Sequence, residues 1–156
     1  MRCHFKLGNY PAAALAAQKI MATGTATPEL TGEARYILTK GYLAQGNIQA
    51  AESELVILSK MTGTEYGAEA SYHLAEIAFN SDRLQDAETL VYALSENYTA
   101  YDYWVARGFI LLADVFTKSG NVFQARQTLQ SIIDNYQGPE LGEIAREKLK
   151  SLEIKE

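Results

Sequence analysis

The sequence predicts an all-α fold of repeated antiparallel helix pairs, and three observations lead to this prediction. Between Phe109 and Tyr136, apolar residues recur in two blocks at three- and four-residue steps, which is the spacing of one helix face. Ser119-Gly120-Asn121 separates the blocks. Glycine can end a helix in the left-handed conformation, and Asn121 can cap the next helix. The same pattern occurs twice more upstream, which indicates a helical repeat array.

The three units have a period of 36 and then 38 residues. Leu38, Leu74 and Leu112 define it, since 74 − 38 = 36 and 112 − 74 = 38. The remaining equivalent positions are Tyr42, Ala78 and Phe116; Gly46, Asp82 and Gly120; Ile48, Leu84 and Val122; Ala51, Ala87 and Ala125; Leu55, Val91 and Leu129; and Leu58, Leu94 and Ile132.

Residues 1–22 resemble the second half of a fourth unit. Gly8 and Ala13 lie 38 residues ahead of Gly46 and Ala51, so they occupy the turn and alanine positions. Little more than one turn precedes Gly8, and a repeat cannot bury its apolar face alone. We therefore expect the chain to be a fragment of a longer repeat protein, or to begin inside a helix. The alternative is a degenerate terminal unit.

The predicted elements follow in order along one domain of residues 1–156. Thr27 can cap a helix that begins at Pro28, a residue suited to the first helical position. A final helix has an apolar side that includes Leu141 and Leu152, and it should cover the end of the core. The predicted repeats are 29–60, 64–97 and 101–136, with a capping helix at 139–154; the predicted helices before that one are 2–7, 10–22, 28–44, 47–60, 65–80, 83–97, 101–118 and 121–136.

The chain resembles the tetratricopeptide repeat (TPR) family. Its repeat of about 34 residues carries Leu and a small residue in the first helix, an aromatic three positions later, a turn Gly, and an Ala five residues after that Gly. In this chain those positions are Leu112-Ala113, Phe116, Gly120 and Ala125; Leu74-Ala75, Ala78, Asp82 and Ala87; and Leu38-Thr39, Tyr42, Gly46 and Ala51.

Two features depart from the TPR pattern. The period is longer, and Asn97-Tyr98 and Asn135-Tyr136 replace the proline that usually ends a repeat. In these features the chain is similar to the longer repeats of bacterial cell-envelope TPR proteins, such as outer-membrane assembly lipoproteins and partners of the Tol–Pal system. The resemblance implies a right-handed α-α superhelix of about three and a half helix pairs, closed by the C-terminal helix.

Composition excludes several classes of function. The chain has 156 residues, a net charge of −5 and intermixed acidic and basic residues, so nucleic-acid binding has little support. Cys3 is the only cysteine, which excludes an intramolecular disulfide and a cysteine-rich metal site. No apolar run approaches the roughly 20 residues of a membrane span. An export signal is not visible either, so an exported parent protein would carry it outside this sequence.

The sequence contains no catalytic motif that predicts an enzyme or a cofactor. It has no phosphate-binding loop, no nucleophile elbow and no zinc-protease motif. Glu69, His73 and Glu76 share one helix face and are the best metal-ligand candidates. The alternative is an ordinary helix-surface pair of Glu69 and His73, because a metal site needs three or four convergent ligands.

The TPR resemblance implies a partner-binding surface, because the first helix of each unit lines a concave face in that family. Aromatic residues with scattered charges suit a peptide or protein partner. Their alternative role is packing against neighbouring repeats. The predicted partner-binding residues are Tyr36, Lys40, Tyr72, Glu76, Trp104, Arg107 and Asp114.

The resulting functional hypothesis is a non-enzymatic scaffold that binds a peptide or protein. We expect it in a bacterial envelope assembly, in the periplasm or cell envelope. The alternatives are a cytoplasmic regulatory adaptor and an oligomerisation segment that forms a homodimer through its N-terminal end. A catalytic domain elsewhere in the parent protein is left open.

Overall fold

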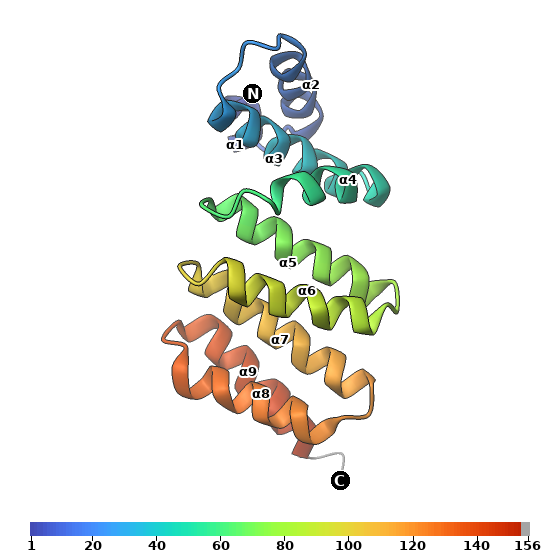
Figure 1. Cartoon of the computed structure of the whole chain (residues 1–156), viewed down its shortest axis with the longest axis vertical. Coiled ribbons are helices and arrows are strands. Elements are labelled where there is room, and N and C mark those ends of the chain that lie inside the picture. Colours follow the sequence, from blue (N-terminus) through green and yellow to red (C-terminus); the bar gives the residue numbers. More distant parts are fainter. Residues whose placement is uncertain (154–156) are drawn as a thin grey trace. The chain divides into compact units, whose positions relative to one another are not determined.

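The structure, a computed structural model, describes residues 1–153, and this part of the chain forms nine α-helices and no strand (Figure 1). The predicted all-α class is confirmed, and the helix ends in this range lie within two residues of those expected. The predicted Ile154 terminus lies outside the described residues. The helices are α1 (Arg2–Lys6), α2 (Tyr10–Ala22), α3 (Pro28–Ala44), α4 (Ile48–Leu58), α5 (Glu65–Asn80), α6 (Leu84–Asn97), α7 (Asp102–Lys118), α8 (Val122–Asn135) and α9 (Pro139–Glu153).

Backbone contacts group the chain into two compact units, one spanning Met1–Ala70 and the other beginning at Ser71. In the first unit α2 packs against α1 and α3, and α3 packs against α4. In the second unit α7 packs against α6 and α8, while α9 packs against both α7 and α8. Helix α5 begins in the first unit and continues into the second. Within the described residues, no helix is both long and apolar enough to cross a membrane.

The four tight turns that join α1 to α2, α3 to α4, α5 to α6 and α7 to α8 share one backbone geometry. Each contains a residue with positive φ, namely Gly8 at +72°, Gly46 at +70°, Asp82 at +62° and Gly120 at +82°. In each turn the backbone N–H of the residue after the positive-φ position donates a hydrogen bond to the carbonyl five residues before it, as in a Schellman cap. These bonds are Asn9 to His4 at 2.9 Å, Asn47 to Tyr42 at 2.9 Å, Arg83 to Ala78 at 2.9 Å, and Asn121 to Phe116 at 2.8 Å.

Asp82 is the strained member of this set, because a residue with a Cβ atom pays about 1–2 kcal/mol in the left-handed region. We expect Asp82→Gly to raise the free energy of unfolding by up to about 1 kcal/mol, since an aspartate tolerates this region better than most residues. Gly120→Ala should instead lower the free energy of unfolding, because it places a Cβ atom at a residue with positive φ. Urea unfolding of the purified variants measures both changes.

An ion pair partly offsets the expected gain at Asp82, whose carboxylate lies 2.8 Å from Lys118 Nζ. Both side chains are substantially exposed, so the pair contributes at most about 1 kcal/mol. Asp82→Gly in a Lys118→Met background separates the two effects. Destabilisation in that background would contradict the backbone-strain argument.

The helix N-termini confirm one predicted cap and correct another. Thr27 Oγ1 accepts a hydrogen bond from the Leu30 N–H at 3.3 Å, as expected for the start of α3. Asn121 occupies the N-cap position of α8, but its side chain makes no cap hydrogen bond within the described residues. Asn9 and Asn47, at equivalent positions, do accept such bonds, each at 3.3 Å.

The core of the first unit is built largely from alanine. Ala13, Ala14 and Ala17 of α2 are buried against Ala34 and Leu38 of α3. Small side chains let the two helix backbones approach closely. A methyl group added at Gly41 would lie 3.0 Å from Ala14 Cβ, which shows how tight this contact is.

Most of the apolar repeat positions predicted from the sequence are buried, whereas Tyr42, Leu84 and Val122 are half-buried and Ile48 is exposed. The positions of Ala51, Leu55, Leu58 and their counterparts in the two later units are all buried. Ile48, the first residue of α4, was predicted on the apolar face but is 44 % exposed.

Candidate functional site

The second unit contains a cleft of about 310 Å³ whose walls are α5, α7 and α9. Four of the seven predicted partner-binding residues, Tyr72, Glu76, Arg107 and Asp114, line this cleft. The structure therefore brings together residues that are up to 42 positions apart, since 114 − 72 = 42. The other lining residues are Phe79, Asn80, Ile110, Leu111, Leu141, Ile144 and Lys148.

Helix periodicity places these side chains on the cleft. Tyr72 and Glu76 of α5 are four residues apart, and Arg107 and Asp114 of α7 are seven apart, so each pair shares one helix face. Leu141, Ile144 and Lys148 of α9 follow the same three- and four-residue spacing.

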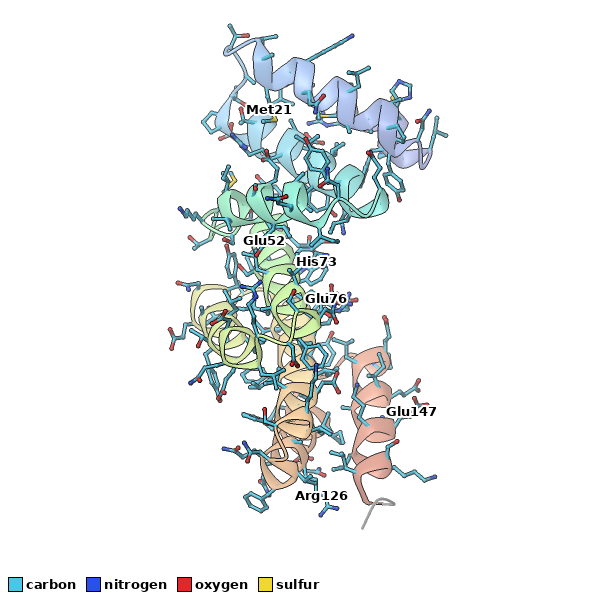
Figure 2. The ribbon with its side chains drawn as sticks, turned by 90° about the vertical axis from the view of Figure 1, so that its right-hand side faces the viewer. Met21, Glu52, His73, Glu76, Arg126 and Glu147 are labelled. Atoms are coloured by element: carbon cyan, nitrogen blue, oxygen red, sulfur yellow. The ribbon has the colours of Figure 1, made fainter. Side chains whose placement is uncertain are left out.

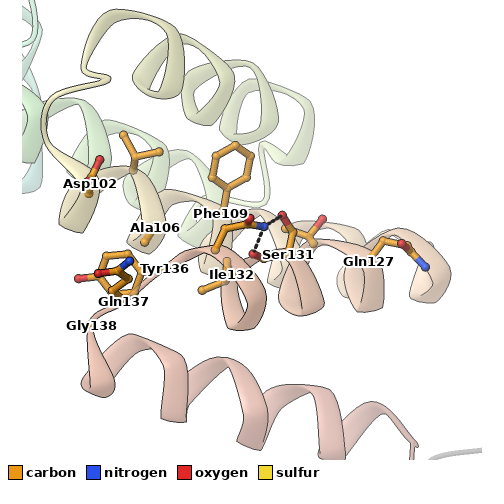
Figure 3. Close-up of a pocket in the computed structure, with 12 residues that line it drawn as sticks. Asp102, Ala106, Phe109, Gln127, Ser131, Ile132, Tyr136, Gln137 and Gly138 are labelled. Atoms are coloured by element: carbon orange, nitrogen blue, oxygen red, sulfur yellow. Dashed lines mark hydrogen bonds between the residues drawn. The ribbon is translucent and has the colours of Figure 1, made fainter.

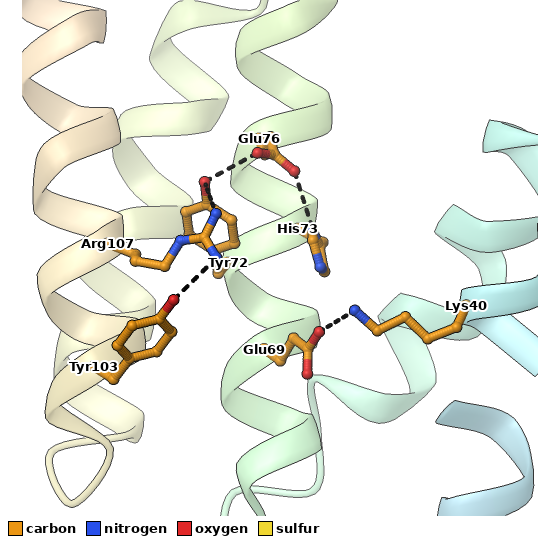
Figure 4. Close-up of polar contacts among 7 residues, drawn as sticks. All are labelled: Lys40, Glu69, Tyr72, His73, Glu76, Tyr103 and Arg107. Atoms are coloured by element: carbon orange, nitrogen blue, oxygen red, sulfur yellow. Dashed lines mark hydrogen bonds and ion pairs between the residues drawn. The ribbon is translucent and has the colours of Figure 1, made fainter. Parts of the chain in front are cut away.

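Arg107 is the centre of the site, since its guanidinium lies over three aromatic rings. Two of them, Tyr72 and Tyr103, are drawn beside it in Figure 4. Its Cζ atom is 4.5 Å from the ring centroid of Tyr72, 5.4 Å from that of Trp104 and 5.8 Å from that of Tyr103. It donates hydrogen bonds to the hydroxyls of Tyr72 at 3.4 Å and Tyr103 at 3.5 Å. Both bonds are long, so stacking rather than hydrogen bonding orients the guanidinium.

Glu76 is held by two neighbours on its own helix. Tyr72 Oη donates to Glu76 Oε1 at 3.0 Å, and His73 Nδ1 lies 2.9 Å from Glu76 Oε2. His73 and Glu76 lie on the same side of α5 (Figure 2). The His73 contact is the largest influence on the pKa of Glu76 and lowers it, whereas partial burial opposes this effect. Burial is the main cause that raises the pKa of Tyr72 to about 12. At neutral pH Tyr72 is thus a neutral donor and Glu76 an ionised acceptor.

Asp114 forms an ion pair with Lys148, which the sequence analysis did not select. Lys148 Nζ lies 2.7 Å from Asp114 Oδ1 and 2.9 Å from Oδ2. The spacing of Lys148 from Leu141 and Ile144 is the sequence signal that could have placed it on this edge of α9. Its partner is 34 residues away, so periodicity alone could not identify the pair.

Trp104 packs against the aromatic rings of the site and is not itself accessible to a partner. It is 8 % exposed, and its ring centroid lies 5.7 Å from Tyr72 and 5.2 Å from Tyr103. Its buried Nε1 has no hydrogen-bond partner within the described residues. Tyr72 is also buried, with 6 % exposure, so its hydroxyl edge and the guanidinium above it are what the cleft presents.

The two remaining predicted residues, Tyr36 and Lys40, lie in the first unit. Lys40 forms an ion pair with Glu69 (Figure 4). Its Nζ lies 5.5 Å from the Tyr36 ring centroid. Tyr36 also contacts the rings of Phe5 and Tyr66, with centroids 6.0 Å and 6.2 Å away. Burial is the main cause that raises the pKa of Tyr36. Tyr36, Phe5 and Tyr66, but not Lys40, line a cavity of about 670 Å³.

The residues that suggested a metal site contact either Lys40 or one another. Glu69 pairs with Lys40, and His73 contacts Glu76. Among residues 1–153, no group of three His, Cys, Asp or Glu side chains is placed to hold a metal ion.

A larger hollow, which sequence reasoning missed, lies along α7 and α8 in the second unit. It encloses about 900 Å³ and is closed at one end by Tyr136-Gln137-Gly138, between α8 and α9 (Figure 3). Its walls carry Gln, Asn, Ser and Thr rather than a recognisable motif, which is why the sequence did not indicate it.

Comparison of the chain with protein-family models gives no match, and a search of curated proteins gives none either. The TPR resemblance and the roles of the seven partner-binding residues therefore stay predictions.

Proposed function

We propose that the chain is a non-enzymatic TPR-type scaffold that binds a segment of a partner protein in the cleft of α5, α7 and α9. In this proposal the helix pairs form a right-handed superhelix, and the cleft lies on its concave face. The observation that carries the proposal is Arg107, which is oriented by stacking and lines the cleft.

Arg107 retains hydrogen-bonding capacity for a partner. A guanidinium has five N–H donors, and within residues 1–153 Arg107 makes only two long hydrogen bonds and no ion pair. The remaining donors can meet a backbone carbonyl or a carboxylate of a bound segment. Because stacking on Tyr72 already orders the side chain, binding loses little further rotamer entropy.

Apolar and charged groups divide the rest of the cleft. Phe79 and Ile144, which line the cleft and are half-buried, offer a surface for an apolar partner side chain. Asp114 and Lys148 neutralise each other, so the cleft favours a short segment of mixed character over a strongly charged one. The proposed envelope location rests on the sequence resemblance alone.

The test is a selection of displayed random peptides against the chain, followed by affinity measurements on the Arg107→Met variant. We expect selected peptides to bind that variant at least about tenfold more weakly, which corresponds to about 1.4 kcal/mol. Trp104 is the single tryptophan and stacks 5.4 Å from the guanidinium, so its fluorescence reports binding directly.

Arg146→Met is the matched control, because Arg146 is an exposed residue of α9 that does not line the cleft. Both variants must keep the circular dichroism and melting temperature of the parent chain. Equal affinity for the parent and Arg107→Met would contradict the proposed site. If no peptide is selected, the binding function itself is contradicted.

Self-association through the first unit is the second candidate function. In this unit Leu7 and Leu15 are 81 % and 56 % exposed, and Phe5, Tyr36 and Tyr66 line a cavity. Exposed apolar side chains of this size favour an interface. Light scattering at micromolar concentration tests this second function, because a monomeric chain would exclude strong self-association.

A further inference from the structure

The hollow between α7 and α8 has the dimensions and chemistry of a second binding groove. Its volume of about 900 Å³ lies within the usual range for ligand sites, about 300–1,000 Å³. Phe109 and Ile132 lie in its middle, Asp102 and Tyr136 lie at one end, and Gln127 lies at the other (Figure 3).

The groove uses a different face of α7 from the cleft. The cleft is lined by Arg107, Ile110, Leu111 and Asp114, whereas Asp102, Val105, Ala106 and Phe109 line the groove. At about 100° per residue, the two sets point in directions roughly 140° apart around the helix axis. One molecule can therefore occupy each site without displacing the other.

Neutral hydrogen-bonding side chains follow one wall of the groove. Gln127, Ser131 and Asn135 succeed one another at four-residue steps on α8, and Gln137 continues the row. Asn135 Nδ2 donates to the Ser131 carbonyl at 2.8 Å, whereas the amides of Gln127 and Gln137 make no hydrogen bond within residues 1–153. Such amides can both donate to and accept from a peptide backbone.

The length of this wall sets the size of the ligand. The eight residue steps from Gln127 to Asn135 rise about 12 Å along α8, at about 1.5 Å per step. An extended peptide advances about 3.3 Å per residue, so about four residues match the wall.

One end of the groove is acidic. Asp102 is the only charged residue that lines it, and Asp102 makes no ion pair within the described part of the chain. Asp102 also lies in the first turn of α7, where a carboxylate interacts favourably with the helix dipole. The pKa of Tyr136 is raised first by burial and then by Tyr103, Asp102 and Glu140, which agrees with a cluster of acidic groups around its phenol.

We propose that this groove binds an extended segment of about four residues from a partner protein, with an Arg or Lys side chain placed between Asp102 and Tyr136. The carboxylate pairs with the cation, and the aromatic ring contacts it. The amides of Gln127 and Gln137 bind the segment's backbone, and Phe109 contacts an apolar side chain. The site is independent of the function proposed for the cleft.

Gly138 gives a way to move Tyr136 without removing it. A Cβ atom at Gly138 would lie 2.3–2.6 Å from three atoms of the Tyr136 side chain, so the phenol must shift in a Gly138→Ala variant. This variant changes the position of the ring and leaves its chemistry intact.

The experiment titrates the isotope-labelled chain with four capped tetrapeptide amides and follows the side-chain NH₂ signals of Gln127, Asn135 and Gln137 by NMR. Two peptides carry Arg, at the first or last position of an Ala/Leu background, and two carry Glu in its place. We expect an Arg peptide to shift these signals at up to about 10 mM, where a millimolar site would be nearly saturated. The Glu peptides should not shift them.

Variants connect the signals to the proposed contacts. Asp102→Asn and Gly138→Ala should each weaken the Arg-peptide affinity by at least about threefold, whereas Arg107→Met in the separate cleft should not change it. The proposal is overturned if neither Arg peptide shifts the signals, if the Glu peptides shift them equally, or if Asp102→Asn binds like the parent chain. It is also overturned if dilution of the chain alone reproduces the shifts, because the occupant would then be a second copy.

Discussion

Replacing Leu94 with alanine should lower the free energy of unfolding by about 2–5 kcal/mol, the usual range for a buried leucine. Leu94 is fully buried in α6 and faces Gly108 of α7. A Cβ atom at Gly108 would lie 2.9 Å from Leu94 Cδ2 and 3.4 Å from Val91 Cγ1. The leucine therefore fills the space that the missing side chain leaves, and its truncation creates a cavity at a close contact between two helices. Urea unfolding measures the loss.

A double-variant cycle with Gly108→Ala tests whether this contact is the cause. In the parent chain the new methyl group meets Leu94, which offsets the gain of about 1 kcal/mol that alanine brings over glycine inside a helix. In the Leu94→Ala background the methyl group enters the vacated space. We expect a favourable coupling of about 0.5–3 kcal/mol. Strictly additive effects would show that Leu94 and Gly108 do not share this contact.

Ala125→Leu should lower the free energy of unfolding by about 1–3 kcal/mol, because added methyl groups overpack a filled core. Ala125 has no exposed surface in α8, and its counterparts Ala51 and Ala87 are equally buried. All three occupy the alanine position that defines the repeat in the sequence. A calorimetric melting temperature reports the change.

Gln124→Leu serves as the control for Ala125→Leu. Gln124 is the preceding residue and is exposed, so it adds a leucine to the same helix without entering the core. The effect of this control should stay within about 0.5 kcal/mol, as is usual at the surface. If the two variants melt at the same temperature, the alignment of the repeats at this position is wrong.

The part of the fold that depends on neighbours in sequence could be predicted. Gly46 and Gly120 end their helices in the left-handed conformation that only glycine adopts at low cost, and Thr27 caps α3 as expected. Asp82 shows that the turn geometry persists where the glycine is missing. Ile48 shows the limit of periodicity, because a residue at a helix end can have the right phase and still lack a neighbour to cover it.

The candidate site was predicted in part. The sequence placed Tyr72, Glu76, Arg107 and Asp114 on equivalent helix faces, and the structure brings them to one cleft. It did not indicate that Tyr72 and Trp104 would be buried under Arg107, because burial depends on how each helix is rotated against the next.

The sequence by itself determined the all-α class, the helix ends and the alanine positions of the core, since these follow from periodicity and from turns of a few residues. Only the tertiary structure decided which charges pair and where the surface is hollow. Lys148 meets Asp114 across 34 residues, and the groove beside Asp102 is formed by two helices and the loop that follows them. Such features depend on the distances and rotations between packed helices, which residue spacing along one chain does not specify.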